Sequence, residues 1–361
     1  MLMNRSNTRN KKVSNDTKLR LERERRRGKK ALSQLEGDIE QVYTSISEEK
    51  VDTSISEEIG STYKLDRPDI RVKIFSDFCS SSLALENYIS TYCIKNNRYH
   101  NILFVDDNSY THAIVLNKDK PELNIPKENV IGFAFEPIYI LNFDSSDIEY
   151  IKNNVGSYYL GDSDDNFPSN FISGYTFMWH SPLVDRNLNC SWSSKPYIMS
   201  LMVGTFKKKL QGHRYRYKIM KKILSSDRDI HIYGIGLDHI KDKRILGPFG
   251  NNEIFTSYKY TIAIQNFVSN DFINEKFTDP LCFNCIPIYY GARNVRKVFG
   301  NSSGYLLSGN LERDIKLINF IYDNPDKYRI DLKYAQEQLA SGKAYFPKFI
   351  ESKWCRPVSE N

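Results

Sequence analysis

The chain has 361 residues, of which 40% are hydrophobic and 26% are charged, so we expect a packed protein large enough for two domains. Its formal net charge of +7 comes from the first 30 residues, which hold 12 Lys and Arg residues against 3 acidic residues. The rest of the chain has a small negative net charge. This argues against a nucleic-acid-binding body, which would need a basic face.

Residues 1–31 form a basic tail that is poor in apolar residues, and we expect it to be disordered. Such a tail can contact an anionic partner, or it can be a solvated extension without one. Residues 32–66 follow as a short amphipathic helix and a low-complexity linker, in which Thr-Ser-Ile-Ser-Glu-Glu occurs twice.

The first globular domain is expected at residues 67–192. Residues 80–94 and 147–154 have helical patterns, and a serine among residues 80–82 is the expected N-cap of the first helix. The strand-like segments that alternate with these helices are residues 70–75, 101–105, 112–116, 130–135 and 157–160.

The second domain is expected at residues 193–345, and residues 346–361 are expected to be a C-terminal tail. Strand-like and helical segments alternate here as well. The expected strands are 197–203, 230–233, 260–265, 286–290 and 304–307, and the expected helices are 214–225, one from about 275, 311–324 and 326–340.

Two series of alternating strands and helices predict an α/β protein with two Rossmann-like domains, each built on a parallel sheet that is covered on both faces. A ligand would bind in the central cleft that the two domains face, at the carboxyl ends of the strands.

The segment around residues 258–295 contains the candidate ligand-binding residues. It reads as a strand, a loop and a helix that starts after Asn274, which is a good N-cap residue. Glu275 complements the helix dipole, but Lys276 does not, unless an anion binds at the same place. The N–H groups of the helix start and a lysine together predict a phosphate site. In the alternative, Lys276 pairs with Glu275 or reaches into water.

This segment resembles a known family. The run Asn274-Glu-Lys-Phe-Thr-Asp279, followed by Ile286-Pro-Ile-Tyr-Tyr-Gly291, is similar to the donor-binding motif of glycosyltransferase family 10, the α1,3/4-fucosyltransferases. The strand that ends in Gln265-Asn266 and the helix start Gly212-His-Arg-Tyr-Arg216 also fit the family. The resemblance covers about residues 198–328 well and the N-terminal half only loosely.

The family resemblance implies a GT-B fold, with two Rossmann-like domains that face a central cleft, GDP-fucose as donor and inversion at the sugar. Glu275 would then bind hydroxyls of the ribose or of the sugar, and Lys276 would hold the diphosphate. Arg216 would neutralise the leaving diphosphate, with Arg214 as the nearby alternative. Phe272 stands where the family often has Tyr and would stack or pack on the donor.

Two asparagines complete the donor-binding residues that the resemblance implies. Asn266 matches the Asn of the family's Glu-Asn pair, and Asn274 stands in place of a Thr and keeps a capping side chain. The sequence departs from the family at Gln265, which replaces Glu, and at Pro280, which would kink the helix beyond its first turn.

An inverting transfer also needs a base for the acceptor hydroxyl. Glu136, in the run Phe133-Ala-Phe-Glu136-Pro137 after a predicted strand, resembles the family's acidic turn before the acceptor cleft and is the candidate catalytic base. In the alternative, Glu136 caps the next turn.

The sequence therefore predicts an inverting glycosyltransferase that moves fucose from GDP-fucose to a hydroxyl of a glycan or glycoconjugate. Three alternatives stay open. The first is a GT-B enzyme with another nucleotide-sugar, and the second is a non-catalytic protein that binds glycan or nucleic acid on a transferase scaffold. The third is a GT-A enzyme that binds a metal through Asp162-Ser-Asp164.

No cofactor is expected, because an arginine and a lysine at the diphosphate make a metal ion unnecessary. The six cysteines are sparse and fit a reducing compartment. The chain has neither a run of about 18 apolar residues nor an apolar signal-peptide core, so we expect a soluble, cytoplasmic protein.

Overall fold

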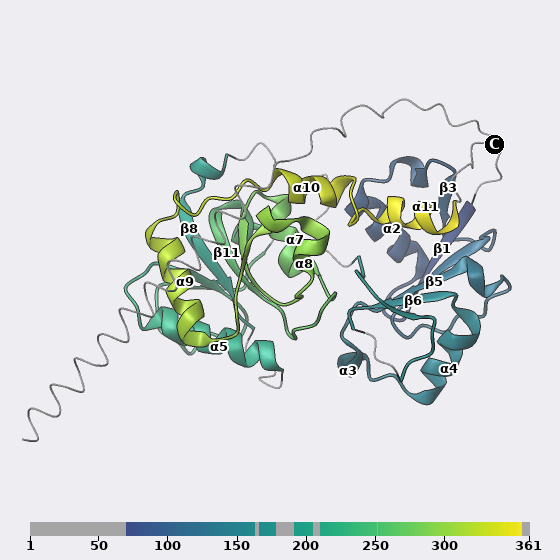
Figure 1. Ribbon diagram of the computed structural model, residues 1–361, viewed down its shortest axis with the longest axis horizontal. Coiled ribbons are helices and arrows are strands. Elements are labelled where there is room, and N and C mark those ends of the chain that lie inside the picture. The colour runs from purple at the N-terminus through teal and green to yellow at the C-terminus, as the bar shows by residue number, and fades with distance from the viewer. Residues whose placement is uncertain (1–69, 163–165, 178–190, 205–209, 251, 356–361) are drawn as a thin grey trace, which may run out of the picture. The chain divides into compact units, whose positions relative to one another are not determined.

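The computed structural model describes residues 70–162, 166–177, 191–204, 210–250 and 252–355 (Figure 1). The expected basic tail at residues 1–31 and the expected helix and linker at residues 32–66 lie outside these residues. In the described part of the chain, the strands form two separate sheets. The expected α/β class with two Rossmann-like sheets is confirmed.

The first sheet has the strand order β2-β3-β1-β4-β5-β6-β7 within the described residues. Its neighbouring strands run parallel, except that β2 is antiparallel to β3 at one edge. The strands are β1 (Ile70–Ser76), β2 (Arg98–Tyr99), β3 (Ile102–Val105), β4 (His112–Leu116), β5 (Val130–Phe133), β6 (Ser157–Leu160) and β7 (Phe171–Ser173).

Helices cover this sheet, and their ends follow from capping residues. The side chain of Ser80 accepts a hydrogen bond from the N–H of Leu83, so α2 (Ser81–Tyr92) begins where the sequence predicts. Asp144 starts α4 (Ser145–Asn154) with a capping box, and the short α3 (Ile138–Leu141) precedes it. Buried residues of α4 and of strands β4 to β7 form one hydrophobic cluster, which holds this helix on the sheet.

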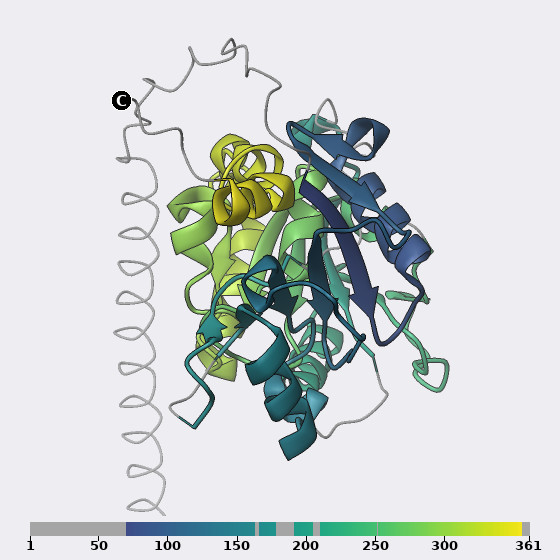
Figure 2. The same cartoon turned by 90° about the vertical axis from the view of Figure 1, so that its right-hand side faces the viewer.

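The C-terminal segment differs from the expected tail. Residues Phe346–Trp354 form helix α11, which contacts the first sheet although it follows the second sheet in sequence. Phe346 is fully buried, with its ring centroid 4.6 Å from that of Tyr88 and 6.0 Å from that of Phe104. In Figure 1 the yellow helix α11 lies beside α2, and Figure 2 shows the same structure turned by 90°. Residues 346–354 form a packed helix because this segment buries aromatic residues, although it has few strong helix signals.

The second sheet has the strand order β10-β9-β8-β11-β12-β13, and its neighbouring strands are parallel. Its strands are β8 (Tyr197–Met202), β9 (His231–Tyr233), β10 (Ile245–Gly247), β11 (Tyr258–Ile264), β12 (Ile286–Tyr290) and β13 (Tyr305–Leu306). The expected domain boundary between residues 192 and 193 stays a prediction.

Helices α5 and α9 lie together on one side of the second sheet, and α7 and α8 lie on the other (Figure 1). The helices of this half are α5 (Gln211–Leu224), α6 (Glu253–Thr256), α7 (Glu275–Cys282), α8 (Val295–Phe299), α9 (Leu311–Asp323) and α10 (Lys333–Ala340).

Helices α10 and α7 differ in detail from what the sequence predicts or suggests. The helix expected over residues 326–340 begins only at Lys333, whose N–H binds the side chain of Asp331 and so starts the helix there. Pro280 lies inside α7, which ends two residues later at Cys282. In the residues that the structure describes, no helix is both long and apolar enough to cross a membrane.

Each sheet has a point where the order of its strands reverses. In the first sheet this point lies between β1 and β4, and in the second it lies between β8 and β11. Parallel α/β sheets bind ligands at such points, outside the carboxyl ends of the strands. The two reversal points are therefore where a functional site is expected.

Candidate active site

The reversal point of the second sheet is closed tightly by the start of α5. Gly212, in the first turn of this helix, donates its N–H to the carbonyl of Asn266 at 3.0 Å. A Cβ atom at Gly212 would lie 1.7 Å from the carbonyl oxygen of Gln265, so only glycine lets the helix approach the end of β11 this closely. This contact brings the second turn of α5 over the end of the strand.

Arg216 is the charged residue that α5 places at this point. It is 5% exposed, and its guanidinium donates to the carbonyl of Ile264 and to the side-chain oxygen of Asn266, the latter at 3.2 Å. Burial lowers the pKa of Arg216 to about 10, while the charge of Glu275 opposes that shift. Its Nε is buried and has no hydrogen-bond partner among the described residues. A buried cation with an unused donor is suited to bind an anion.

The loop after β11 leads into the start of α7. Asn274 caps this helix, because its side-chain oxygen accepts the N–H of Lys276 at 3.1 Å and also a hydrogen bond from the Gln265 side chain. The sequence predicts this cap correctly. Because its side-chain oxygen is already used twice, Asn274 shapes the helix start.

Glu275 and Lys276 form an ion pair with each other, and both side chains are mostly buried. This is the pairing that the sequence leaves open as the alternative to a phosphate site. The two readings are compatible, since an ammonium group has three donors and one carboxylate oxygen uses only one of them.

Glu136 lies three residues beyond β5, at the carboxyl edge of the first sheet. The turn before it is held by Asn117, whose side-chain oxygen accepts the N–H of Phe135 at 2.8 Å and whose side-chain nitrogen donates to Asp77 at 3.2 Å. Asn117 follows β4 and has a φ of 52°, a conformation that asparagine tolerates better than most residues. It joins the ends of β1, β4 and β5.

The electrostatics of Glu136 link this edge to the start of α7. Burial raises the pKa of Glu136, the positive charge of Lys276 lowers it, and the negative charge of Glu275 raises it. The candidate base therefore lies within electrostatic reach of the two residues predicted to hold the donor. A carboxylate with a raised pKa is a better proton acceptor than an exposed one.

The loop before α7 also contacts the end of β6 directly. The N–H of Asp271 donates to the carbonyl of Gly161, and the N–H of Asn270 donates to the side chain of Asp162, both at 3.0 Å. A Cβ atom at Gly161 would lie 2.4 Å from that of Phe272, which is itself buried. Asp162 thus serves a backbone contact, and Asp164 lies outside the described residues. The role of Phe272 toward a donor stays a prediction.

The comparison with protein families gives a match to this half of the chain. The family model described as Glycosyltransferase family 10 (fucosyltransferase) C-term matches residues 192–345. Residues 192–345, which match this model, are called the family 10 domain below. It includes the second sheet, the start of α5 and the start of α7, which are the parts that carry Arg216 and Lys276.

Known proteins are similar to parts of the chain. It is 25% identical over 118 residues to GDP-fucose protein O-fucosyltransferase 3 of Canis lupus familiaris, which covers 32% of this chain and 25% of that protein. It is 29% identical over 84 residues to Alpha-(1,3)-fucosyltransferase B of Drosophila melanogaster, which covers 23% of this chain and 19% of that protein. The chain thus spans a quarter or less of the length of these curated relatives.

A crystal structure of an α1,3-fucosyltransferase is similar to the chain with a TM-score of 0.48 and 13% sequence identity, over 82% of this chain and 91% of that one. The fold of the family 10 domain follows from its own strand order.

The structure groups most of the predicted site residues. Arg216 and Asn266 are hydrogen-bonded, and Asn274, Glu275 and Lys276 form the start of α7. Arg214 lies on the exposed side of α5, two residues before the buried Arg216. Asn117 and Gly161 are not among the residues that the sequence predicts for the site. An asparagine directly after a strand of a parallel sheet was the available signal for the first, and no local pattern indicates the second.

Proposed function

We propose that this protein is an inverting glycosyltransferase that transfers fucose from GDP-fucose to a hydroxyl of a glycan or glycoconjugate. The family 10 domain at residues 192–345 and the relatives named as fucosyltransferases support the donor. The observation that carries the proposal is electrostatic. Glu136 is a partly buried carboxylate of the first sheet, and its pKa is shifted by the charges of Glu275 and Lys276 of the family 10 domain.

Each residue has a defined part in the proposed reaction. Arg216 and Lys276 bind oxygens of the diphosphate, and Glu275 accepts hydrogen bonds from sugar or ribose hydroxyls. In the transition state negative charge grows on the diphosphate, so these two fixed cations stabilise it more than they stabilise the bound donor.

The bonds change as follows. The acceptor oxygen attacks the anomeric carbon of fucose from the face opposite the diphosphate, and its proton passes to the carboxylate of Glu136. The bond between the anomeric carbon and the diphosphate oxygen breaks, and GDP leaves with the electron pair. Attack from the opposite face inverts the anomeric carbon, and the positive charges of Arg216 and Lys276 take the place that a metal ion has in other transferases.

A panel of nucleotide-sugars tests the donor. GDP-fucose, GDP-mannose and UDP-glucose are each incubated with the protein and a glycan mixture, and released GDP or UDP is measured with and without EDTA. We expect turnover with GDP-fucose that EDTA leaves unchanged. Turnover with UDP-glucose alone would contradict the donor, and loss of turnover in EDTA would contradict the charge assignment.

Glu136→Gln tests the base separately from the donor site. We expect transfer to fall by about 10²–10⁴-fold, the usual contribution of a general base, while GDP binding measured by calorimetry stays unchanged. The matched control is Glu128→Gln, which changes an exposed carboxylate just before β5, the strand that Glu136 follows. Full activity of Glu136→Gln would assign that residue to the structure of the turn.

A further inference from the structure

A cavity opens at the reversal point of the first sheet, and no step of the proposed reaction uses it. Its volume is about 270 Å³. The walls come from the loop after β1, the end of β4, the residues after β5 and one side of α2, so it lies where parallel sheets of this kind bind ligands. The lining residues that matter here are Phe78, Ala84, Tyr88, Leu116, Phe135 and Phe177.

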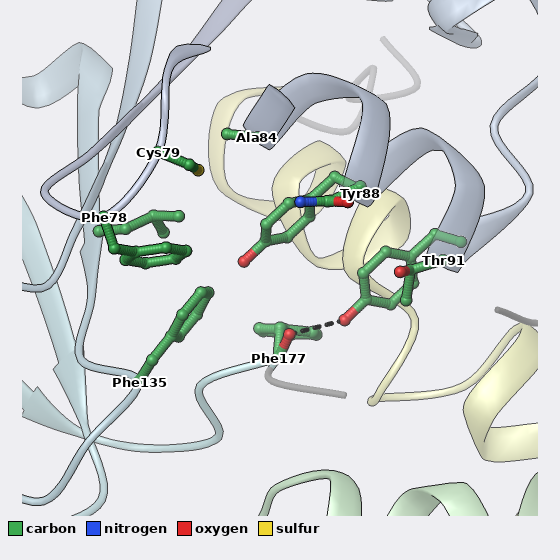
Figure 3. Close-up of a pocket in the computed structure, with 10 residues that line it drawn as sticks. Phe78, Cys79, Ala84, Tyr88, Thr91, Phe135 and Phe177 are labelled. Atoms are coloured by element: carbon green, nitrogen blue, oxygen red, sulfur yellow. Dashed lines mark hydrogen bonds between the residues drawn. The ribbon is translucent and has the colours of Figure 1, made fainter. Parts of the chain in front are cut away.

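Five of the ten residues that line the cavity are aromatic, and Asn87 and Thr91 add polar side chains. The ring centroid of Phe135 is 6.1 Å from that of Phe78 and 6.3 Å from that of Tyr88, which stacks on it at 20°. Phe78 is 58% exposed at the mouth, although an aromatic ring of this size is usually covered. Figure 3 shows these rings and Phe177 around a common space. An exposed aromatic residue at the mouth of an aromatic cavity is typical of a ligand site.

One buried hydroxyl group of the cavity wall, that of Tyr88, has no hydrogen-bond partner among the described residues. Tyr88 as a whole is 7% exposed. The hydroxyl points toward Phe78 and Phe135 (Figure 3). Burial raises the pKa of Tyr88 well above its ordinary value, so this group is a neutral hydrogen-bond donor and acceptor. A buried hydroxyl without a partner is unfavourable by about 1–3 kcal/mol, and a ligand with one polar group would relieve this.

The cavity and the candidate base share one short segment of the chain, the turn after β5. Phe135 lines it, and Glu136 is the next residue. The N–H of Phe135 is bound by the side-chain oxygen of Asn117, which holds the backbone of this turn. The cavity and the candidate base therefore both lie at the carboxyl end of β5.

We infer that the cavity binds an aromatic group of the acceptor, next to the hydroxyl that is glycosylated, with the Tyr88 hydroxyl bonded to a polar substituent of that group. This inference rests on the proposed function. A pyranose is a poorer occupant, because each of its hydroxyls needs a partner and five of the ten lining residues are aromatic. A single ring with one substituent fits a cavity smaller than those that hold drug-sized molecules.

Binding of benzyl alcohol, measured by ligand-observed NMR on the full chain, tests the inference without any turnover. We expect saturable binding, which Ala84→Leu abolishes by filling the cavity. Leu83→Ala is the matched control, because Leu83 is the neighbouring residue of α2 and is exposed. No saturable binding to the wild type, or binding that survives Ala84→Leu, would overturn the inference.

Tyr88→Phe provides a second test that does not depend on the filled cavity folding. The hydroxyl has no partner to lose, so we expect an unchanged or higher melting temperature, with benzyl alcohol affinity reduced by about 2–10-fold, the effect of one hydrogen bond. A clear fall in melting temperature with unchanged affinity would show that the hydroxyl is held by the fold, and would overturn the inference.

The same variants separate this inference from the proposed function. We expect phenyl β-D-galactopyranoside to be a better acceptor than methyl β-D-galactopyranoside for the wild type and an equal one for Ala84→Leu, while binding of GDP is the same in both. If GDP-fucose is not a donor but benzyl alcohol still binds as described, the proposed function fails and the cavity stands. If GDP-fucose is used and benzyl alcohol does not bind, the cavity fails and the function stands.

Discussion

The carboxyl edges of the two sheets are built in different ways. At the edge of the second sheet, charged and amide side chains that are near one another in sequence surround one buried arginine, and glycines let the backbones touch. At the edge of the first sheet, aromatic rings from four separate segments surround a cavity. The charged edge is suited to the diphosphate, an anion that all nucleoside-diphosphate sugars share. The aromatic edge is suited to a group that differs between acceptors.

The two edges also depend on different parts of the chain. The charged edge uses residues of the family 10 domain alone, whereas the aromatic edge depends on α11, whose Phe346 packs against Tyr88 and Tyr92. A change in the C-terminal helix should therefore reach the first sheet and leave donor binding intact. The predictions below separate the two edges.

The largest effect on stability is expected for Phe346→Ala. Phe346 is fully buried, so we expect the free energy of unfolding to fall by about 3–5 kcal/mol, as for other large core residues. Chemical denaturation measures it, and Lys348→Ala, an exposed position of the same helix, is the control. A loss below that of an exposed residue would mean that α11 does not hold the first sheet.

Arg216→Ala should have the largest effect on the charged edge. We expect kcat to fall by about 10²–10³-fold, as when one fixed donor to a developing negative charge is removed, with Arg216→Lys between this and the wild type. Steady-state kinetics with GDP-fucose measure it, and Lys218→Ala on the exposed side of α5 is the control. If Arg214→Ala is the more damaging change, Arg214 takes the catalytic assignment.

Gly212→Ala tests how closely α5 must approach β11. The added Cβ would lie 1.7 Å from a backbone oxygen, so the helix start must shift, and we expect a loss of about 1–3 kcal/mol in the free energy of unfolding. Gly204→Ala is the matched control, since a Cβ there has nothing within 4 Å. Equal melting temperatures for the two variants would refute the close contact.

The smallest effect is a shift in the pH profile of kcat/KM. Glu136 must be ionised to accept a proton, so activity falls as the pH drops through its pKa, which burial raises above the ordinary range for glutamate. Lys276 lowers that pKa and Glu275 raises it. Lys276→Met should therefore move the acidic limb to higher pH, and Glu275→Gln should move it to lower pH. Shifts in the opposite directions would mean that the limb reports another group.

The sequence by itself determined the α/β class, most of the strands and helices of both halves, the cap at Asn274 and the motif that groups Glu275 with Lys276. These features depend on residues within one turn of helix or one strand, so their signals are local.

Only the tertiary structure decided how separate segments meet. It packs α11 on the first sheet, buries Arg216 at the end of β11, and brings Glu136 within electrostatic reach of Lys276. It also surrounds the Tyr88 hydroxyl with rings from distant segments. Burial and long-range contacts depend on which surfaces the whole chain removes from water, and no local window of sequence contains that information.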